Sequence, residues 1–380
     1  MKSSHMLFAT ALMFAAFSVQ ANNNTEPLTS KEGYPCLYSK HIRQDLSQCV
    51  IGYFDKNGLL IKNDGSLNVA DVAYYRVLLD KNKYGQHVIQ SFFPNGQKKT
   101  SAVVINARGD LLSKTTMSSL QADGLVMFWN TEGQKIIELS YRSGILEGYA
   151  KSWYDNGQLS FEGRYVDGKL DGRVLTYHKN GQMEQDSYYK GGKFDGRTTR
   201  WYDNGQKDLE AEYYDGAVVG THTTWYKNGQ KESQAFKQYN SIHGAYKRWY
   251  ENGQLEFIYP YNQGQVEGVV KKYFPNGQLF EEFTVVKGWT EGEKKTWYMN
   301  GRLKLVETYQ KSKLNGPFTK YHENGKKMAQ GSYLDGVLDG LLTSWDMIKN
   351  QTIEQQYIKG KETSFKVIRE DGTETDYTVN

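Results

Sequence analysis

The stretch Trp153-Tyr154-Asp155-Asn156-Gly157-Gln158 recurs along the chain at a spacing of 24 residues. Its glycines fix the spacing, and they are Gly157, Gly181, Gly205, Gly229, Gly253, Gly277, Gly301 and Gly325. Gly133 stands one further step upstream, which makes nine copies in phase. A period of this length indicates a repeat protein in which each copy is one supersecondary unit.

Each copy predicts a β-hairpin. Asn-Gly between two aromatic-rich runs favours a type I′ turn, because both central residues of that turn need a positive φ. A two-residue loop at Asn156-Gly157 pairs Trp153 with Ser160 across the hairpin. The same register sets Trp201 opposite Asp208, Trp225 opposite Glu232 and Trp249 opposite Glu256. A slip of one residue would exchange the two faces of the sheet, so this expectation depends on the turn type.

Alternation along the strands separates two faces. One face is expected to carry Leu159, Phe161 and Tyr165, with Gly163 leaving room for them, and to be the better buried. The other face carries the Trp153 column beside charged residues. A second motif in the same phase, Gly168-Lys169-Leu170-Asp171-Gly172, turns the chain into the next hairpin. The predicted fold is all-β, an elongated antiparallel sheet of tandem 24-residue β-hairpin repeats.

The period sets the expected segments. They are a signal peptide at 1–21, an N-terminal cap at 22–52, degenerate repeats with insertions at 53–127, tandem repeats at 128–348, and a C-terminal cap hairpin at 349–380. Atypical end units are expected because terminal repeats must cap an exposed sheet.

The N-terminus has the features of an export signal. Lys2 precedes an apolar run from Met6 to Val19, which is too short to span a bilayer, and Val19-Gln20-Ala21 matches the small-x-small cleavage pattern. We therefore expect a periplasmic or secreted protein cleaved after Ala21. In that oxidising setting Cys36 and Cys49 are expected to form a disulfide.

Composition and motifs argue against several functions. The chain has 47 basic and 43 acidic residues, whereas a general nucleic-acid binder needs clustered excess positive charge. No Walker loop, Gly-x-Ser-x-Gly elbow or metal-ligand spacing occurs, and no later segment is apolar enough to span a membrane. We predict a protein that is not an enzyme and that has no cofactor, no metal and no transmembrane segment.

The candidate partner-binding residues are aromatic and basic. They are Trp153, Trp201, Trp225, Trp249, Trp297, Lys247, Arg248, Lys271, Lys272, Lys294 and Lys295. The tryptophans either brace the sheet or form an interface, where Trp often carries binding energy. The basic residues form either a lattice of cross-strand salt bridges, with Lys271 facing Glu282 and Lys272 facing Glu281, or a ridge for an acidic protein, a phospholipid head group or an anionic glycan.

The segment Phe161-Glu162-Gly163-Arg164-Tyr165-Val166-Asp167-Gly168-Lys169-Leu170-Asp171-Gly172 resembles the MORN repeat. The Asn-Gly-Gln turn and the 24-residue period resemble its bacterial variant, found in predicted antitoxins of the YwqK type. The resemblance implies an exported immunity protein that binds a secreted bacterial toxin. The alternative is a cell-envelope scaffold or adhesion factor that binds lipid, glycan or another protein. Some copies depart from the pattern, because Gly163 is replaced by Ser187, Ala211, Tyr259 and Glu307.

The export signal leads to a direct prediction. Mass spectrometry of the protein from its producing cell should find Asn22 as the first residue. An intact Met1 on a cytoplasmic protein would refute the export signal and remove the ground for the Cys36–Cys49 bond.

Overall fold

The computed structural model describes residues 50–61, 68–106 and 116–378. The predicted signal peptide, its cleavage site and the Cys36–Cys49 pair lie outside these residues. Among the described residues, no helix is both long and apolar enough to cross a membrane. The chain divides into two compact units, Met1–Phe194 and Asp195–Asn380, and each is treated by itself.

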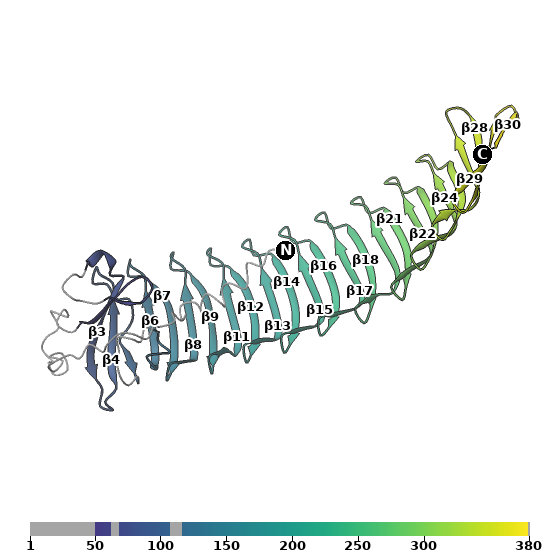
Figure 1. The fold of residues 1–380 in the computed structure, drawn as a ribbon. Helices are drawn as coiled ribbons and strands as arrows, with labels where there is room; N and C mark the ends of the chain where they lie inside the picture. Colours follow the sequence, from purple (N-terminus) through teal and green to yellow (C-terminus); the bar gives the residue numbers. More distant parts are fainter. Residues whose placement is uncertain (1–49, 62–67, 107–115, 379–380) are drawn as a thin grey trace. The chain divides into compact units, whose positions relative to one another are not determined.

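The first unit is an antiparallel sheet in which the strands follow one another in chain order from β3 to β12, with β1 and β2 added before β3. Its strands appear in Figure 1 in purple to teal, with a short 3-10 helix at Val69–Asp71 between β2 and β3. They are β1 Val50–Phe54, β2 Leu60–Ile61, β3 Tyr74–Lys81, β4 His87–Phe92, β5 Val103–Ile105, β6 Ala122–Trp129, β7 Lys135–Arg142, β8 Ile145–Trp153, β9 Leu159–Val166, β10 Lys169–Leu170, β11 Gly172–Tyr177 and β12 Met183–Lys190.

The second unit begins within β13, and its strands pair antiparallel in chain order. The short strands β19 and β26 are followed by β20 and β27, which pair with β18 and β25 in their turn. Figure 1 shows these strands side by side in green to yellow. They are β13 Lys193–Trp201, β14 Lys207–Tyr214, β15 Ala217–Trp225, β16 Lys231–Gln238, β17 Ser241–Trp249, β18 Leu255–Asn262, β19 Gln265–Val266, β20 Gly268–Tyr273, β21 Leu279–Val286, β22 Trp289–Trp297, β23 Leu303–Gln310, β24 Lys313–Tyr321, β25 Lys327–Leu334, β26 Val337–Leu338, β27 Gly340–Asp346, β28 Gln351–Ile358, β29 Lys361–Arg369 and β30 Glu374–Thr378.

The Asn-Gly turns are not the predicted type I′ turns. The Gly157 N–H donates to the Tyr154 carbonyl at 2.9 Å, and the Tyr154 N–H donates to the Gln158 carbonyl at 2.8 Å. Only Gly157, with φ of +83°, is in the left-handed region. The loop therefore has three residues, Asp155 to Gly157, which is a type I turn closed by a glycine bulge.

This longer loop changes the register next to the turn. Trp153 pairs with Leu159, and Ser152 pairs with Phe161 as expected, so Ser160 is an extra bulged residue. The predicted Trp153–Ser160 pair is therefore wrong, and Leu159 lies on the face of Trp153 instead of the face of Phe161. Beyond the bulge the predicted register is confirmed.

The type I′ turn occurs at the other end of each hairpin. Val166 pairs with Lys169, and the two residues between them, Asp167 and Gly168, have φ of +48° and +76°. A positive φ at both central positions is the defining feature of this turn. The repeats therefore have two different edges, which we name the Asn-Gly edge and the type I′ edge.

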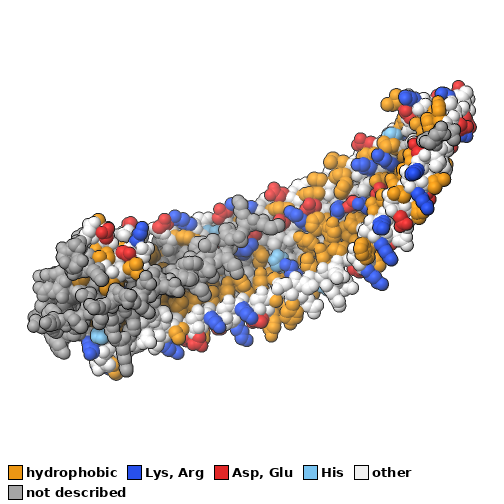
Figure 2. Space-filling view, in the orientation of Figure 1, with side chains coloured by type: hydrophobic (Ala, Val, Ile, Leu, Met, Phe, Trp, Pro, Cys, Tyr) orange, Lys and Arg blue, Asp and Glu red, His pale blue; other side chains and the backbone are white. Residues whose placement is uncertain are grey.

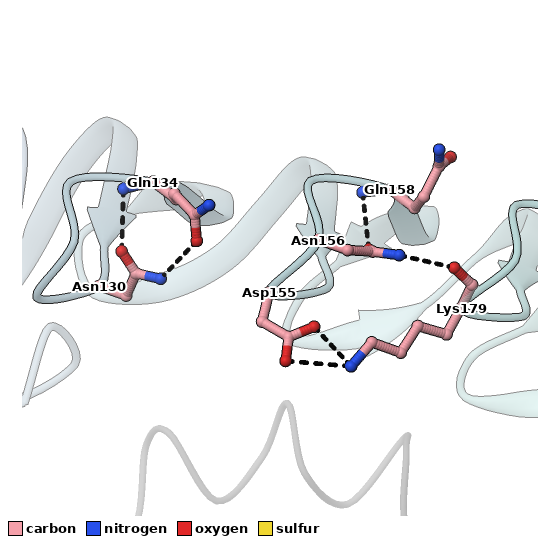
Figure 3. Close-up of polar contacts among 6 residues, drawn as sticks. All are labelled: Asn130, Gln134, Asp155, Asn156, Gln158 and Lys179. Atoms are coloured by element: carbon pink, nitrogen blue, oxygen red, sulfur yellow. Dashed lines mark hydrogen bonds and ion pairs between the residues drawn. The ribbon is translucent and has the colours of Figure 1, made fainter.

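Side chains link successive turns along the Asn-Gly edge (Figure 3). The Asn156 Oδ1 accepts from the Gln158 N–H at 3.1 Å, within its own turn, and the Asn156 Nδ2 donates to the Lys179 carbonyl of the next turn at 2.8 Å. The same step of 23 residues recurs at Asn204, Asn228, Asn252, Asn276 and Asn300. A second bond of this step runs from the Tyr154 hydroxyl to the Tyr177 carbonyl at 2.8 Å.

The glutamine of each turn explains a second requirement for glycine. A Cβ at Gly181 would lie 3.0 Å from the Gln158 Oε1, so the preceding repeat occupies the space of a side chain there. Gly157 has nothing within 4 Å of that position. Figure 3 shows why: the Gln134 carboxamide turns back to Asn130, whose Nδ2 donates to the Gln134 Oε1 at 2.9 Å.

The type I′ edge is linked by the second motif. The Gly192 N–H donates to the Leu170 carbonyl at 2.8 Å, and the Asp171 Oδ2 accepts from the Gly191 N–H at 3.2 Å. Glu147 and Asp339 accept from the following turn in the same way. The acid of the motif is therefore a cap for the next turn.

The buried core is concentrated in the first unit. One cluster contains Leu78, Ile89, Val103, Ile105, Leu120, Ala122 and Val126. The next contains Leu139, Ala150, Phe161, Tyr165, Leu170 and Val174, and a Cβ at Gly163 would meet the Phe161 ring at 2.9 Å, as expected for a glycine that leaves room. In the second unit the buried apolar side chains are few and small, mainly alanine and valine. That unit is a single open layer.

Two substitutions separate the two reasons for glycine in the turns. Gly157→Ala meets only the strain of a positive φ, which costs about 1 kcal/mol. Gly181→Ala meets the same strain and the Gln158 carboxamide as well, so its free energy of unfolding should fall further. Urea denaturation of the two variants measures the difference.

The control removes the obstructing side chain. In a Gln158→Ala background, the two alanine substitutions should cost the same. A difference that survives in this background would show that the Gln158–Gly181 contact does not couple the repeats.

Candidate binding surfaces

Each repeat presents two chemically different faces. We call the side that carries Trp153 and Lys151 the Trp face, and the side that carries Phe161, Gly163 and Tyr165 the Tyr face. Counterparts of these residues in other repeats keep the same face because the register recurs. In the view of Figure 2, hydrophobic side chains gather along the middle of the strands of the second unit, with charged side chains towards the edges.

The tryptophan column is interleaved with lysines. In the second unit Trp225 pairs with Lys231 and Trp249 with Leu255, so the predicted placement of acids opposite these rings is wrong. Trp201 likewise pairs with Lys207 and not with Asp208. The cause is the bulge, which moves each acid onto the Tyr face.

Each such lysine reaches the tryptophan of the following repeat. The Lys207 Nζ lies 5.5 Å from the Trp225 ring centroid, and the Lys231 Nζ lies 5.7 Å from that of Trp249. In the first unit the Lys135 Nζ lies 4.1 Å from the Trp153 ring. These distances fit cation–π contacts. Trp153, Trp201, Trp225, Trp249 and Trp297 are all half-buried, so part of each ring faces solvent.

The predicted basic residues are divided between the two faces. Lys247, Lys271 and Lys295 lie on the Trp face, and their neighbours Arg248, Lys272 and Lys294 lie on the Tyr face. Adjacent residues of a strand point to opposite sides. The sequence pairs therefore do not make one ridge.

On the Trp face Lys271 and Lys295 are bound to carboxylates. The Lys271 Nζ lies 2.9 Å from the Glu282 Oε2, and that hydrogen bond raises the pKa of Lys271. The Lys295 Nζ lies 2.9 Å from the Glu293 Oε2. Such exposed pairs contribute only about 0–1 kcal/mol each. These two pairs neutralise part of the positive charge of this face and favour specificity over affinity.

On the Tyr face two lysines share one buried acid. The Glu281 carboxylate is 7% exposed, and its two oxygens lie 2.7 Å from the Lys272 Nζ and 2.8 Å from the Lys294 Nζ. Burial alone would raise the pKa of Glu281, but the hydrogen bonds from both lysines outweigh it, and the pKa is lowered. Both amines also lie beside the Phe283 ring. The pairing of Lys272 with Glu281 confirms the predicted register.

An aromatic cluster lies on the Tyr face, on which alternation along the strand predicts Phe257, Tyr259 and Tyr261. The Tyr246 ring lies 5.4 Å from Phe257 and 6.4 Å from Tyr261, and Phe257 lies 5.1 Å from Tyr259. Tyr259 stands where the repeat usually has Gly163 or another small residue. The replacement of this small residue by tyrosine is the sequence feature that indicates an aromatic cluster here. Tyr259 pairs with Tyr246 in the regular register, so the large side chain fits without a change of register.

The histidines have structural surroundings. His178 and His322 occupy the turn position of Tyr154, with the same backbone hydrogen bonds. Burial, assisted by Lys237 and Arg200, lowers the pKa of His222 to about 4, so this ring is neutral at physiological pH. Among the residues that the structure describes, no three His, Cys, Asp or Glu side chains are grouped so as to hold a metal ion.

Comparison with known proteins identifies the repeats. The family model described as the MORN repeat variant matches residues 146–167, 170–190, 242–263, 266–287 and 314–335. No curated protein matches the chain. The matched segments cover hairpins in both units, and each contains one Asn-Gly turn with the strands on either side of it. MORN repeats in an all-β fold are typical of binding or scaffold proteins. The chain is therefore a MORN-repeat protein.

Proposed function

We propose that the protein is a non-catalytic binding protein that holds another protein against its Trp face. The support is the tryptophan column, whose half-buried rings alternate with lysine amines at regular spacing. Trp at an interface contributes a large apolar area with little loss of conformational entropy, and few such residues carry most of the binding energy.

We further propose that the partner is a secreted bacterial toxin, so that the protein acts as an exported immunity protein. The export signal before Asn22 and the resemblance to predicted antitoxins support this partner. The Trp face favours a protein partner over a polyanion, because the amines of Lys271 and Lys295 are already bound to Glu282 and Glu293. An envelope scaffold that binds lipid or glycan is the competing outcome of the experiment.

The double variant Trp225→Ala, Trp249→Ala tests the proposal. It should weaken partner binding by about 2–4 kcal/mol, while the melting temperature falls by only a few degrees. Affinity capture from the native periplasm, followed by calorimetric titration with the purified partner, measures the first quantity. Thermal unfolding measures the second.

The matched control is Tyr226→Ala. The Tyr226 hydroxyl donates to the Trp249 carbonyl at 2.8 Å, so this change should lower the melting temperature. If the tryptophan variant instead unfolds as the tyrosine variant does, and binding fails only with unfolding, the column braces the sheet and the proposal is wrong. Sedimentation of the wild type with membranes or peptidoglycan, without a protein partner, would favour the envelope scaffold.

A further inference from the structure

We infer that the type I′ edge of the last repeats is a second binding site, for an acidic segment of a protein. Four consecutive turns form it, at residues 286–289, 310–313, 334–337 and 358–361. We call this surface the lysine edge. It lies in the second unit and is separate from the tryptophan column, which follows the other edge.

The turns of the lysine edge are held in one line. The Ser312 N–H donates to the Thr290 carbonyl at 2.9 Å, and the Gly336 N–H donates to the Leu314 carbonyl at 2.8 Å. The Gly360 N–H donates to the Leu338 carbonyl at 2.8 Å. Since each repeat contributes two strands about 4.8 Å apart, neighbouring turns are about 10 Å apart. The side chains of the edge are therefore presented by fixed backbone.

The four turns of the lysine edge carry more positive than negative side chains. Its sixteen residues include five lysines, Lys287, Lys311, Lys313, Lys359 and Lys361, and a single acid, Asp335. All five lysine side chains are exposed, and none of their amines has a carboxylate within 4.0 Å among the described residues. The carboxylates of Glu267, Glu291 and Asp339 lie at the same edge, where they accept from the backbone N–H groups of Lys287, Lys311 and Lys359 at 2.8, 2.9 and 2.8 Å.

The turn itself does not require lysine. The three preceding type I′ turns of the same unit, at 214–217, 238–241 and 262–265, contain none. Their backbone is the same, since Gln263 has φ of +49° and Lys287 has φ of +51°. The positive charge therefore has no structural explanation in the turn and points to an anionic partner.

Exposed apolar side chains stand among the lysines. Trp289 is 53% exposed and Ile358 is 57% exposed, and Val286, Leu334 and Val337 are also exposed. At the start of the edge an open hollow of about 570 Å³ is lined by Tyr259, Val266, Val285, Lys287 and Trp289, with Gln265 and Gly288. Such a hollow can receive one large apolar side chain, with the Lys287 amine beside it.

These features favour an extended acidic protein segment over a lipid surface. Four turns span about 30 Å, which about nine extended residues also span. An interfacial membrane site needs a continuous apolar face. Here that face is interrupted at the second turn, where Gln310 and Lys313 are both polar and exposed. A segment that alternates carboxylates with apolar side chains matches both the charges and the hollow.

The test uses the full chain and a fluorescein-labelled ten-residue peptide of alternating Glu and Leu with one Trp. Fluorescence anisotropy should show binding that weakens as salt rises, because exposed charges are screened. The variant Lys287→Gln, Lys311→Gln, Lys359→Gln should lose about tenfold or more in affinity. Gln263 already occupies the same turn position, so these changes suit the backbone. Trp289→Ala should also weaken binding, through the hollow.

The control removes three charges from the Asn-Gly edge, as Lys179→Gln, Lys227→Gln, Lys326→Gln, and should change affinity by less than about twofold. Circular dichroism checks that every variant is folded. Equal losses in the two triple variants would overturn the inference, as would equal binding of a peptide with Lys in place of Glu. Binding to phosphatidylserine vesicles without binding to the acidic peptide would assign the edge to lipid and overturn it too. The Trp225→Ala, Trp249→Ala variant should bind the peptide normally. A failure of the Trp-face proposal can therefore be distinguished from a failure of the lysine-edge inference.

Discussion

The rest of the structure depends on one carboxamide that bonds in two directions. The Asn156 oxygen closes its own turn, and the Asn156 nitrogen holds the next turn at the Lys179 carbonyl. Because one planar group makes both contacts, the shape of each turn and the distance to the next are fixed together. A sheet with little buried apolar surface can therefore keep its strand register, since the turns fix the register that the packing of a core would otherwise fix.

This arrangement leaves the faces of the second unit free to vary. Structural needs are met at the edges, by the Asn-Gly turns, the type I′ turns and the acids that cap them. The middle of each strand can then hold Tyr259 or Glu307 where other repeats hold a small residue. It is at such positions that the buried Glu281 group and the aromatic cluster occur, next to a backbone that remains regular.

Much of the fold could be predicted from the sequence, because the period and the turn glycines are local signals. The pairing of Lys271 with Glu282 followed from them and is confirmed. The turn type could not be obtained from Asn156-Gly157 alone, since Asp155 is also part of the loop and the Asn156 side chain stabilises the longer form. That single residue moved the acids away from the tryptophans. The lysine edge was missed because its residues are far apart in the sequence and meet only through the stacking of the second kind of turn.

The Asn, Tyr and Gln links between successive Asn-Gly turns all have the same direction. Asn156, Tyr154 and Gln158 each act on the repeat that follows, and none of them needs anything from the repeat before. The array therefore has a polarity, because each turn donates the same contacts to the turn that follows it. After gain or loss of one whole unit of 24 residues, each remaining turn still has a following turn to bond to. Such a gene can therefore change length by duplication or deletion without any new contact having to arise.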